Sequence, residues 1–344
     1  MNESSTNVAV SPEDNLIISD QLMQQLDVFL NCFLIHLLSF LGIVGNALNI
    51  LVLSSRGFKE TSDIFLVSLS VSDLMFSVIQ PIHGLRCIVS KFDVSLSKTV
   101  DTFVTVYVPI TDIWVGLSIG TITAIAVERF FAVLFPFHVS RIFTPFRVKC
   151  VVVFLYVYTL GMTSPLSFRF DYEWVFDPLE NRTTVRYINS NFYNDNYNAV
   201  NIYGGFFLNN SFTTATLLTI LICSVVITIK LTVGHSKQLA MSSSGQGRKK
   251  VKDRRAGKML LTVCLVALIV FLPTAIVDMY KAYAEINLFS QDNLKLNDLL
   301  QSINYVLYQF NASINIVIYV TMSRKFAAAY RNFCCPKTRT GKKH

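Results

Sequence analysis

Seven long apolar segments most constrain how this chain can fold. A helix needs about 20 mostly apolar residues to cross the roughly 30 Å of bilayer hydrocarbon. Because the chain lacks the alternation of a β-barrel, helices are the remaining way to satisfy its backbone in lipid. The candidate spans lie near residues 29–55, 62–88, 101–133, 148–168, 203–231, 257–283 and 298–322. The sequence therefore predicts an all-α membrane protein, a seven-helix transmembrane bundle.

The composition supports this prediction. Hydrophobic residues make up 52% of the 344 and charged residues only 15%, whereas a soluble domain has about 25% charged residues. We divide the chain into a tail (1–28), a transmembrane domain (29–322) and a C-terminal part (323–344). The tail is polar and lacks the basic start and apolar core of a secretory signal. We therefore expect the first span to direct membrane insertion.

The distribution of charge predicts the orientation of the bundle. The first 55 residues contain five acids and no Lys or Arg. With that end outside, the inner segments hold 22 of the 30 Lys and Arg residues. This positive-inside bias predicts an outer N-terminus and an inner C-terminus, which are extracellular and cytoplasmic in the plasma membrane, the location that we expect. The net charge of +8 is then a sign of topology, not of a nucleic-acid partner.

Two features of the loops agree with this orientation. The basic run RKKVKDRRAGK (248–258) lies between two spans, which favours a cytoplasmic loop over the alternative of a nuclear signal or RNA patch. Asn2 and Asn181 begin glycosylation sequons in polar segments on the outer side. The seven scattered cysteines contain no CxxC pair, which argues against a zinc site.

Several polar residues lie inside the spans, where such residues are costly and often functional. Asp73 is near the middle of the second span, and Ser118 precedes Arg129 by eleven residues, about three helical turns. The residues that recur every four positions in the last span, and so share one face, are Asn311, Asn315 and Tyr319. Interhelical hydrogen bonding remains the alternative for any single one of them.

One acid–base pair lies within an apolar run, AIAVERFFAVLFPF (124–137). Glu128 and Arg129 fall where the third span meets the cytoplasm. A lone guanidinium would be expensive in such a partly dry place, and an adjacent carboxylate offsets that cost.

The order of these motifs resembles that of the rhodopsin-like, class A G-protein-coupled receptors. The motifs are GN (45–46), LSVSD (69–73), ERFFAVLFP (128–136), FLP (271–273) and NIVIY (315–319). SRKFAAAYRNFCC (323–335) resembles the family's short amphipathic helix 8, and Cys334 and Cys335 match positions that are palmitoylated in many relatives. The resemblance covers roughly residues 29–335.

The resemblance implies a receptor, not an enzyme, that binds an extracellular ligand and activates a heterotrimeric G protein by shifting a conformational equilibrium. It implies switch roles for Glu128, Arg129, Asn315 and Tyr319. The alternative is a small multi-span transporter or channel, which would require acids at several depths of the membrane.

The resemblance also implies a partner for Arg129. Asp253 is the only acid between Lys230 and Lys258 and lies twenty residues before Pro273, about 30 Å along a helix. In the family, an acid at this spacing pairs with the Arg of the third helix at rest. The alternative, that Asp253 only dilutes a basic run, stays open.

The chain departs from the family pattern at several motifs. The family's Cys at the outer end of the third helix is Val104 here, and loop 169–203 contains no Cys. Other departures are Tyr156, Phe271 and Ile316, where the family has Trp, Trp and Pro. Such drift is typical of a divergent branch, such as invertebrate chemosensory or orphan peptide-type receptors.

We therefore expect folding without the usual outer disulfide. Cys87 has no evident partner in that loop, and a bond to Cys32 stays open. On this basis Cys87→Ser would leave surface expression largely intact.

The resemblance also bears on ligands. Amine receptors of the family carry an Asp eighteen residues before the Arg of the third helix, and here that residue is Thr111. We expect a polar small molecule or a peptide in an outer pocket formed by Thr111, Asp112, Phe271, Asp278 and Lys281. A solvated helix end is the alternative for Asp278 and Lys281.

An ion site is the one cofactor expected. The family's sodium pocket matches Asp73, Ser118 and Asn311, with Asn315 behind them. Oxygen ligands around one buried carboxylate suit such an ion.

Overall fold

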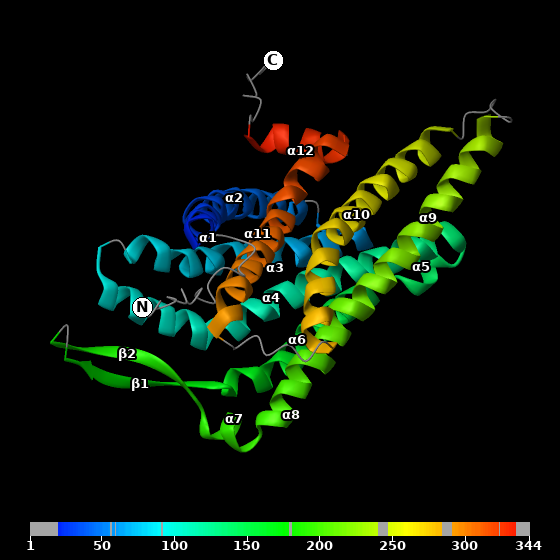
Figure 1. The fold of residues 1–344 in the computed structure, drawn as a ribbon. Helices are drawn as coiled ribbons and strands as arrows, with labels where there is room; N and C mark the ends of the chain where they lie inside the picture. The colour runs from blue at the N-terminus through cyan, green and yellow to red at the C-terminus, as the bar shows by residue number, and fades with distance from the viewer. Residues whose placement is uncertain are drawn as a thin grey trace, which may run out of the picture.

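The computed structural model describes residues 20–55, 57–58, 60–90, 92–178, 181–239, 247–283, 291–322 and 324–334. Within these residues, seven long helices form the bundle, as predicted, and the chain folds back on itself at each turn between them (Figure 1). In chain order the elements are α1 (Asp20–Asp27), a π-helical segment (Val28–Leu34), α2 (Ile35–Ser54), α3 (Thr61–Val89), α4 (Val94–Leu134), α5 (Val139–Ile142), α6 (Pro145–Thr163), a 3-10 segment (Ser164–Phe168), β1 (Phe170–Asp177), β2 (Arg182–Asn189), α7 (Asn191–Asp195), α8 (Tyr197–Ile202), a second π-helical segment (Tyr203–Thr214), α9 (Ala215–Leu239), α10 (Gly247–Tyr283), α11 (Gln291–Met322) and α12 (Arg324–Cys334).

Five helical stretches among the described residues are long and apolar enough to cross a membrane. They are Gln21–Ser54, Thr61–Val89, Ile110–Leu134, Pro145–Phe168 and Gly257–Val277. The predicted fifth and seventh spans are less apolar. α9 contributes only the shorter stretch Ala215–Lys230, because the polar residues before it form the second π-helical segment. α11 turns a polar face inward, which carries the buried Gln309, Asn311, Ser313 and Asn315.

Some boundaries differ from those predicted. The first helix begins at Asp20, inside the predicted tail, and α4 begins at Val94, before residue 101. The start of α6 has a clear local cause. Thr144 adopts an extended conformation and its side-chain oxygen accepts a hydrogen bond from the backbone N–H of Arg147. Pro145 then occupies the first helical position, where its missing N–H costs nothing.

A β-hairpin between α6 and α7 was not predicted. β1 and β2 pair antiparallel, with Tyr172 opposite Tyr187 and Glu173 opposite Arg186. The hairpin projects from one end of the bundle, and α12 lies at the other (Figure 1). We call these the hairpin end and the α12 end.

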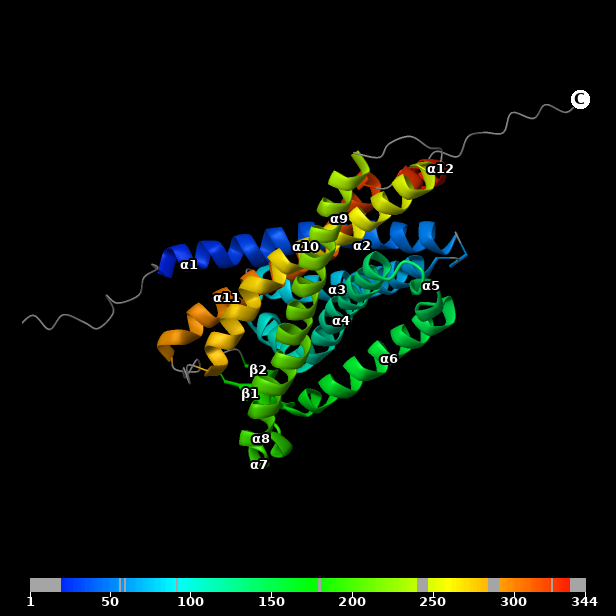
Figure 2. The same ribbon diagram turned by 90° about the vertical axis from the view of Figure 1, so that its right-hand side faces the viewer.

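One cluster of buried apolar side chains forms the core of the bundle. Phe65 and Leu69 of α3, Ile122 and Ile125 of α4, and Tyr319 of α11 are all fully buried in one cluster. The opposite pattern holds on the outside of α6, where apolar side chains face away from the protein. Such an apolar exterior is what a membrane-spanning bundle presents to lipid. Figure 2 shows α6 along the edge of the bundle.

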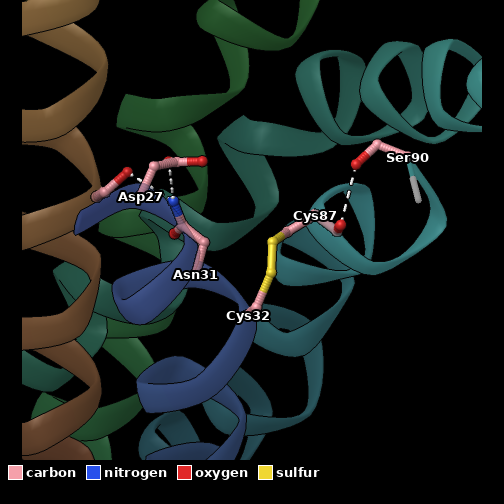
Figure 3. The surroundings of a disulfide bond; sticks show 6 residues. Asp27, Asn31, Cys32, Cys87 and Ser90 are labelled. Atoms are coloured by element: carbon pink, nitrogen blue, oxygen red, sulfur yellow. Dashed lines mark hydrogen bonds between the residues drawn. A yellow bond between two sulfur atoms is a disulfide. The ribbon is translucent and has the colours of Figure 1, made fainter. Parts of the chain in front are cut away.

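A disulfide joins the first two long helical stretches at the hairpin end. Cys32, in the first π-helical segment, bonds to Cys87 near the end of α3, with the two Cα atoms 5.7 Å apart (Figure 3). Next to it, the side-chain amide of Asn31 donates hydrogen bonds to Asp27 (2.7 Å) and Ser302 of α11 (2.9 Å). The bond to Cys32, which the sequence left open, is therefore formed. The two cysteines are 55 residues apart, and only the packing of the two helices brings them together.

Candidate functional site

A buried carboxylate lies at the centre of the bundle, where α3, α4 and α11 meet. Asp73 is 1% exposed. The Ser118 hydroxyl donates to its Oδ1 and the Asn315 side-chain amide donates to its Oδ2, each at 2.7 Å. The structure thus brings together three of the residues that the sequence singled out, each from a different helix.

Asn311, the fourth residue of the expected ion site, is less directly connected to Asp73. Asn311 is buried one turn before Asn315, but in the described part of the chain no hydrogen bond joins it to Asp73. The donor set still fits a hard cation, because Asp73 and Ser118 present carboxylate and hydroxyl oxygens side by side. Asn315 offers its N–H, not its oxygen, to the carboxylate, which agrees with a supporting position behind the ligands.

Glu128 and Arg129 both lie on α4, and a residue of α3 also bonds to Glu128. A guanidinium nitrogen of Arg129 lies 2.9 Å from Oε2 of Glu128, and the two side chains are 18% and 4% exposed. The Thr61 hydroxyl, at the start of α3, donates to Oε1 of Glu128 at 2.5 Å. Sequence reasoning missed Thr61, since nothing in the sequence shows which side of α3 faces α4. The side chain of Asp253 lies outside the described residues.

Tyr319 connects α11 to the amphipathic helix that follows. Its side chain is fully buried, its ring centroid lies 5.4 Å from that of Phe326 in α12, and its hydroxyl has no hydrogen-bond partner among the described residues. Tyr319 is thus held by packing.

A polar chain also joins α12 to the bundle. The Tyr330 hydroxyl of α12 donates to Oδ1 of Asn49. Asn49 in turn donates to Asn46 at 3.4 Å, and Asn46 donates to the Ala312 carbonyl of α11 at 2.8 Å. Asn49 and Tyr330 were missed. The spacing of Asn46 and Asn49, three residues apart on one face of α2, was the available signal.

A second polar group lies nearer the hairpin end. Thr111 is fully buried, and its hydroxyl lies 3.3 Å from Nε2 of His83 in α3. The His83 ring is 5.3 Å from the ring of Tyr305 in α11, whose hydroxyl accepts a 3.0 Å hydrogen bond from Gln301. The sequence indicated Thr111 but not His83 or Tyr305.

The other expected pocket residues are dispersed. Asp112 is exposed while its neighbour Thr111 is buried, because consecutive helical residues point about 100° apart. Phe271 is buried, with its ring 5.1 Å from that of Tyr308. The side chains of Asp278 and Lys281 lie outside the described residues.

Near the Thr111–His83 contact, polar atoms of two side chains are buried without a hydrogen bond. Gln80 is 0% exposed, and neither its amide oxygen nor its nitrogen has a partner among the described residues. The indole nitrogen of Trp114 is in the same situation. Gln80 and Trp114 are each one helical turn from His83 and Thr111, on the same helix faces. Since buried polar groups are normally paired, these atoms have hydrogen-bonding capacity that water or a polar ligand could meet.

The hairpin is held against the end of α4 by non-covalent contacts. The Thr102 hydroxyl donates to the Val185 carbonyl of β2 at 2.9 Å, and both residues are almost fully buried. A cavity of about 400 Å³ lies beside this contact, and its polar lining includes Lys98, Asp101 and Arg186. Arg186 also forms a 2.6 Å ion pair with Glu173 on the opposite strand.

The chain matches the model of a known family over most of its length. Residues 45–319 match the family model described as the seven-transmembrane receptor (rhodopsin family). The chain belongs to this family.

Individual members of the rhodopsin family share modest sequence identity with this chain. The chain is 23% identical to a GQ-coupled rhodopsin of Mizuhopecten yessoensis over 88% of its own length and 60% of the relative's. It is 23% identical to an allatostatin-A receptor of Bombyx mori over 88% of its length and 80% of that receptor's. A growth hormone secretagogue receptor type 1 of Mustela putorius furo is 26% identical over 45% of this chain and 43% of its own. The chain thus spans less than two thirds of the length of some relatives it matches.

The expected modification sites of this rhodopsin-family receptor are placed only in part. Asn181 is exposed directly before β2 and has a left-handed φ of 51°, which Asn tolerates better than most residues. Asn2, Cys335 and the side chain of Cys334 lie outside the described residues.

Proposed function

We propose that the chain is a plasma-membrane receptor that binds a polar ligand at the hairpin end, on the outside, and activates a heterotrimeric G protein at the α12 end, in the cytoplasm. The observation that carries this proposal is the Glu128–Arg129 pair. It leaves the Arg129 side chain at the α12 end 18% exposed and paired with the Glu128 carboxylate, which also accepts a hydrogen bond from Thr61. Such a restrained charge can be released by a small rearrangement of α4 against α3, which is what a two-state switch requires.

A peptide is the ligand class that we favour over a chemosensory small molecule. The names of several relatives support it, since they are receptors for allatostatin-A and QRFP-like peptides and a secretagogue receptor. The unpaired amide of Gln80 and indole of Trp114 suit a guest that carries both donors and acceptors, as a peptide backbone does. Thr111, engaged with His83, offers no charge to a monoamine.

The remaining roles belong to the same proposal. Sodium would bind between Asp73 and Ser118, supported by Asn315, with Asn311 nearby. Asp253 would approach Arg129 in the resting state, Asn2 and Asn181 would be glycosylated, and Cys334 and Cys335 palmitoylated. A transporter or channel is the less favoured alternative, because the family consists of receptors.

The deciding experiment is G-protein activation in cells. Receptor and G-protein subunits carrying luminescent and fluorescent reporters would be co-expressed, and a library of peptides and monoamines applied. The expected result is activation by one peptide class, with no monoamine response, and loss of all signal in Arg129→Ala at equal surface expression. Activation by nanomolar monoamines, lost in Thr111→Leu, would contradict the peptide assignment. Full signalling by Arg129→Ala would contradict the switch.

A further inference from the structure

An apolar groove lies between α9 and α10, which run next to each other in Figure 1 and cross in the view of Figure 2. Its volume is about 160 Å³, and every lining side chain is Leu or Ile. The lining residues are Leu217, Leu218 and Leu221 of α9 and Leu268, Ile269 and Leu272 of α10.

The groove opens outward, away from the core of the bundle. Leu218, Leu221, Ile269 and Leu272 are 54%, 47%, 73% and 50% exposed, whereas Leu217 is buried at its base. Its walls belong to the apolar stretches Ala215–Lys230 and Gly257–Val277. In a membrane, the medium around these walls is therefore bilayer hydrocarbon.

We infer that the groove is a binding site for a lipid acyl chain. A lining made only of Leu and Ile offers no hydrogen bond, so a headgroup or polar ligand would lose its own bonds on entry. An apolar cavity of about 150 Å³ holds one benzene molecule, so this groove accommodates a few methylene groups of a chain. The bilayer supplies such chains at high local concentration.

A lipid acyl chain in this groove touches both α9 and α10. The opposite face of α10 is part of the receptor's interior. Phe271, next to the lining residue Leu272, is 2% exposed, and its ring centroid lies 5.1 Å from that of Tyr308 in α11. Any movement of α10 relative to α9 changes the groove. An acyl chain that fits one arrangement therefore favours it, in proportion to its difference in affinity between the two. This regulatory role rests on the proposed signalling function, whereas the binding site itself does not.

The site is tested by photolabelling of the full-length receptor in phospholipid nanodiscs. The probe is a phosphatidylcholine with a diazirine in its acyl chain, and labelled residues are mapped by mass spectrometry. We expect labelling at Ile269 and Leu272 several-fold above that at Val153 and Val157 of α6, which are similarly exposed at 62% and 66%. This excess should be displaced by unlabelled lipid. Labelling that simply follows exposure would overturn the site.

Substitutions then separate acyl-chain binding in the groove from the general effect of placing a large side chain on the membrane-facing surface. Leu221→Trp fills the groove and should abolish the excess at Ile269 and Leu272, while the matched control Val157→Trp should retain it. Leu218→Phe serves if Leu221→Trp does not reach the membrane. In the G-protein assay, the groove variant should change basal activity at least threefold relative to the control. Loss of labelling with unchanged basal activity would overturn the regulatory role. A wild type that activates no G protein would count against the proposed function alone, since the labelling result stands independently.

Discussion

The hydroxyl of Thr61 donates a 2.5 Å hydrogen bond to Glu128, the carboxylate that also holds Arg129. The contact joins the start of α3 to the end of α4. It gives Glu128 two partners on different helices, so the acid–base pair is fixed in position and not merely adjacent in sequence.

Removing this hydroxyl should raise basal signalling. A hydrogen bond to a charged group contributes about 1.5–3 kcal/mol, so Thr61→Val should shift the resting–active equilibrium by roughly tenfold or more if the bond exists only at rest. Basal G-protein activation at matched surface expression measures this. Thr61→Ser keeps the hydroxyl and should resemble wild type. An unchanged Thr61→Val would show that Glu128 holds Arg129 unaided.

Two acids compete as the resting partner of Arg129, and substitution distinguishes them. Glu128→Gln removes the partner seen in the structure, and Asp253→Asn removes the one expected from the family resemblance. A partly dry charge pair of about 1–3 kcal/mol corresponds to a five- to about 150-fold rise in basal activity, while Arg129→Ala should be silent. A rise in Glu128→Gln alone would assign the resting lock to the local pair. A rise in Asp253→Asn alone would assign it to α10.

Sodium should stabilise the receptor through Asp73. In thermal unfolding of purified receptor, replacing potassium chloride with sodium chloride at constant ionic strength should raise Tm by about 2–4 °C, as expected for roughly 1 kcal/mol of binding. Asp73→Asn should abolish the difference, and Ser118→Ala should reduce it. Because Asn311 makes no described hydrogen bond to Asp73, Asn311→Ala should have the smallest effect. An equal sodium response in Asp73→Asn would place the ion elsewhere.

The Cys32–Cys87 bond reverses the expectation for Cys87→Ser. A disulfide typically contributes about 2–4 kcal/mol to stability, so this substitution should lower both Tm and surface expression. Cys32→Ser should do the same, and the double variant should lose no more than either single one. Cys150→Ser, at an exposed free cysteine, is the control. Normal expression of both single variants would mean that helix packing alone holds this end.

The sequence predicts those features that depend on one helix at a time. Apolar length placed the spans, and helical periodicity placed Asn311, Asn315 and Tyr319 on one face, whereas the meeting of Ser118 and Asn315 with Asp73 was expected from the family resemblance. Contacts such as His83 with Thr111 depend instead on how each helix is rotated and tilted against its neighbour, which no local pattern records. The hairpin was missed for a related reason, because its strands also contact the end of α4, through Thr102 and Val185.

The way in which the hairpin is attached determines how freely its sequence can vary. The loop that carries it contains no cysteine, and the hydrogen bond described between α4 and β2 ends on a backbone carbonyl, that of Val185. A carbonyl is present whatever side chain occupies the position. The side chains of residues 170–189 can therefore be changed, by selection or in an experimental chimera, without having to conserve a covalent anchor.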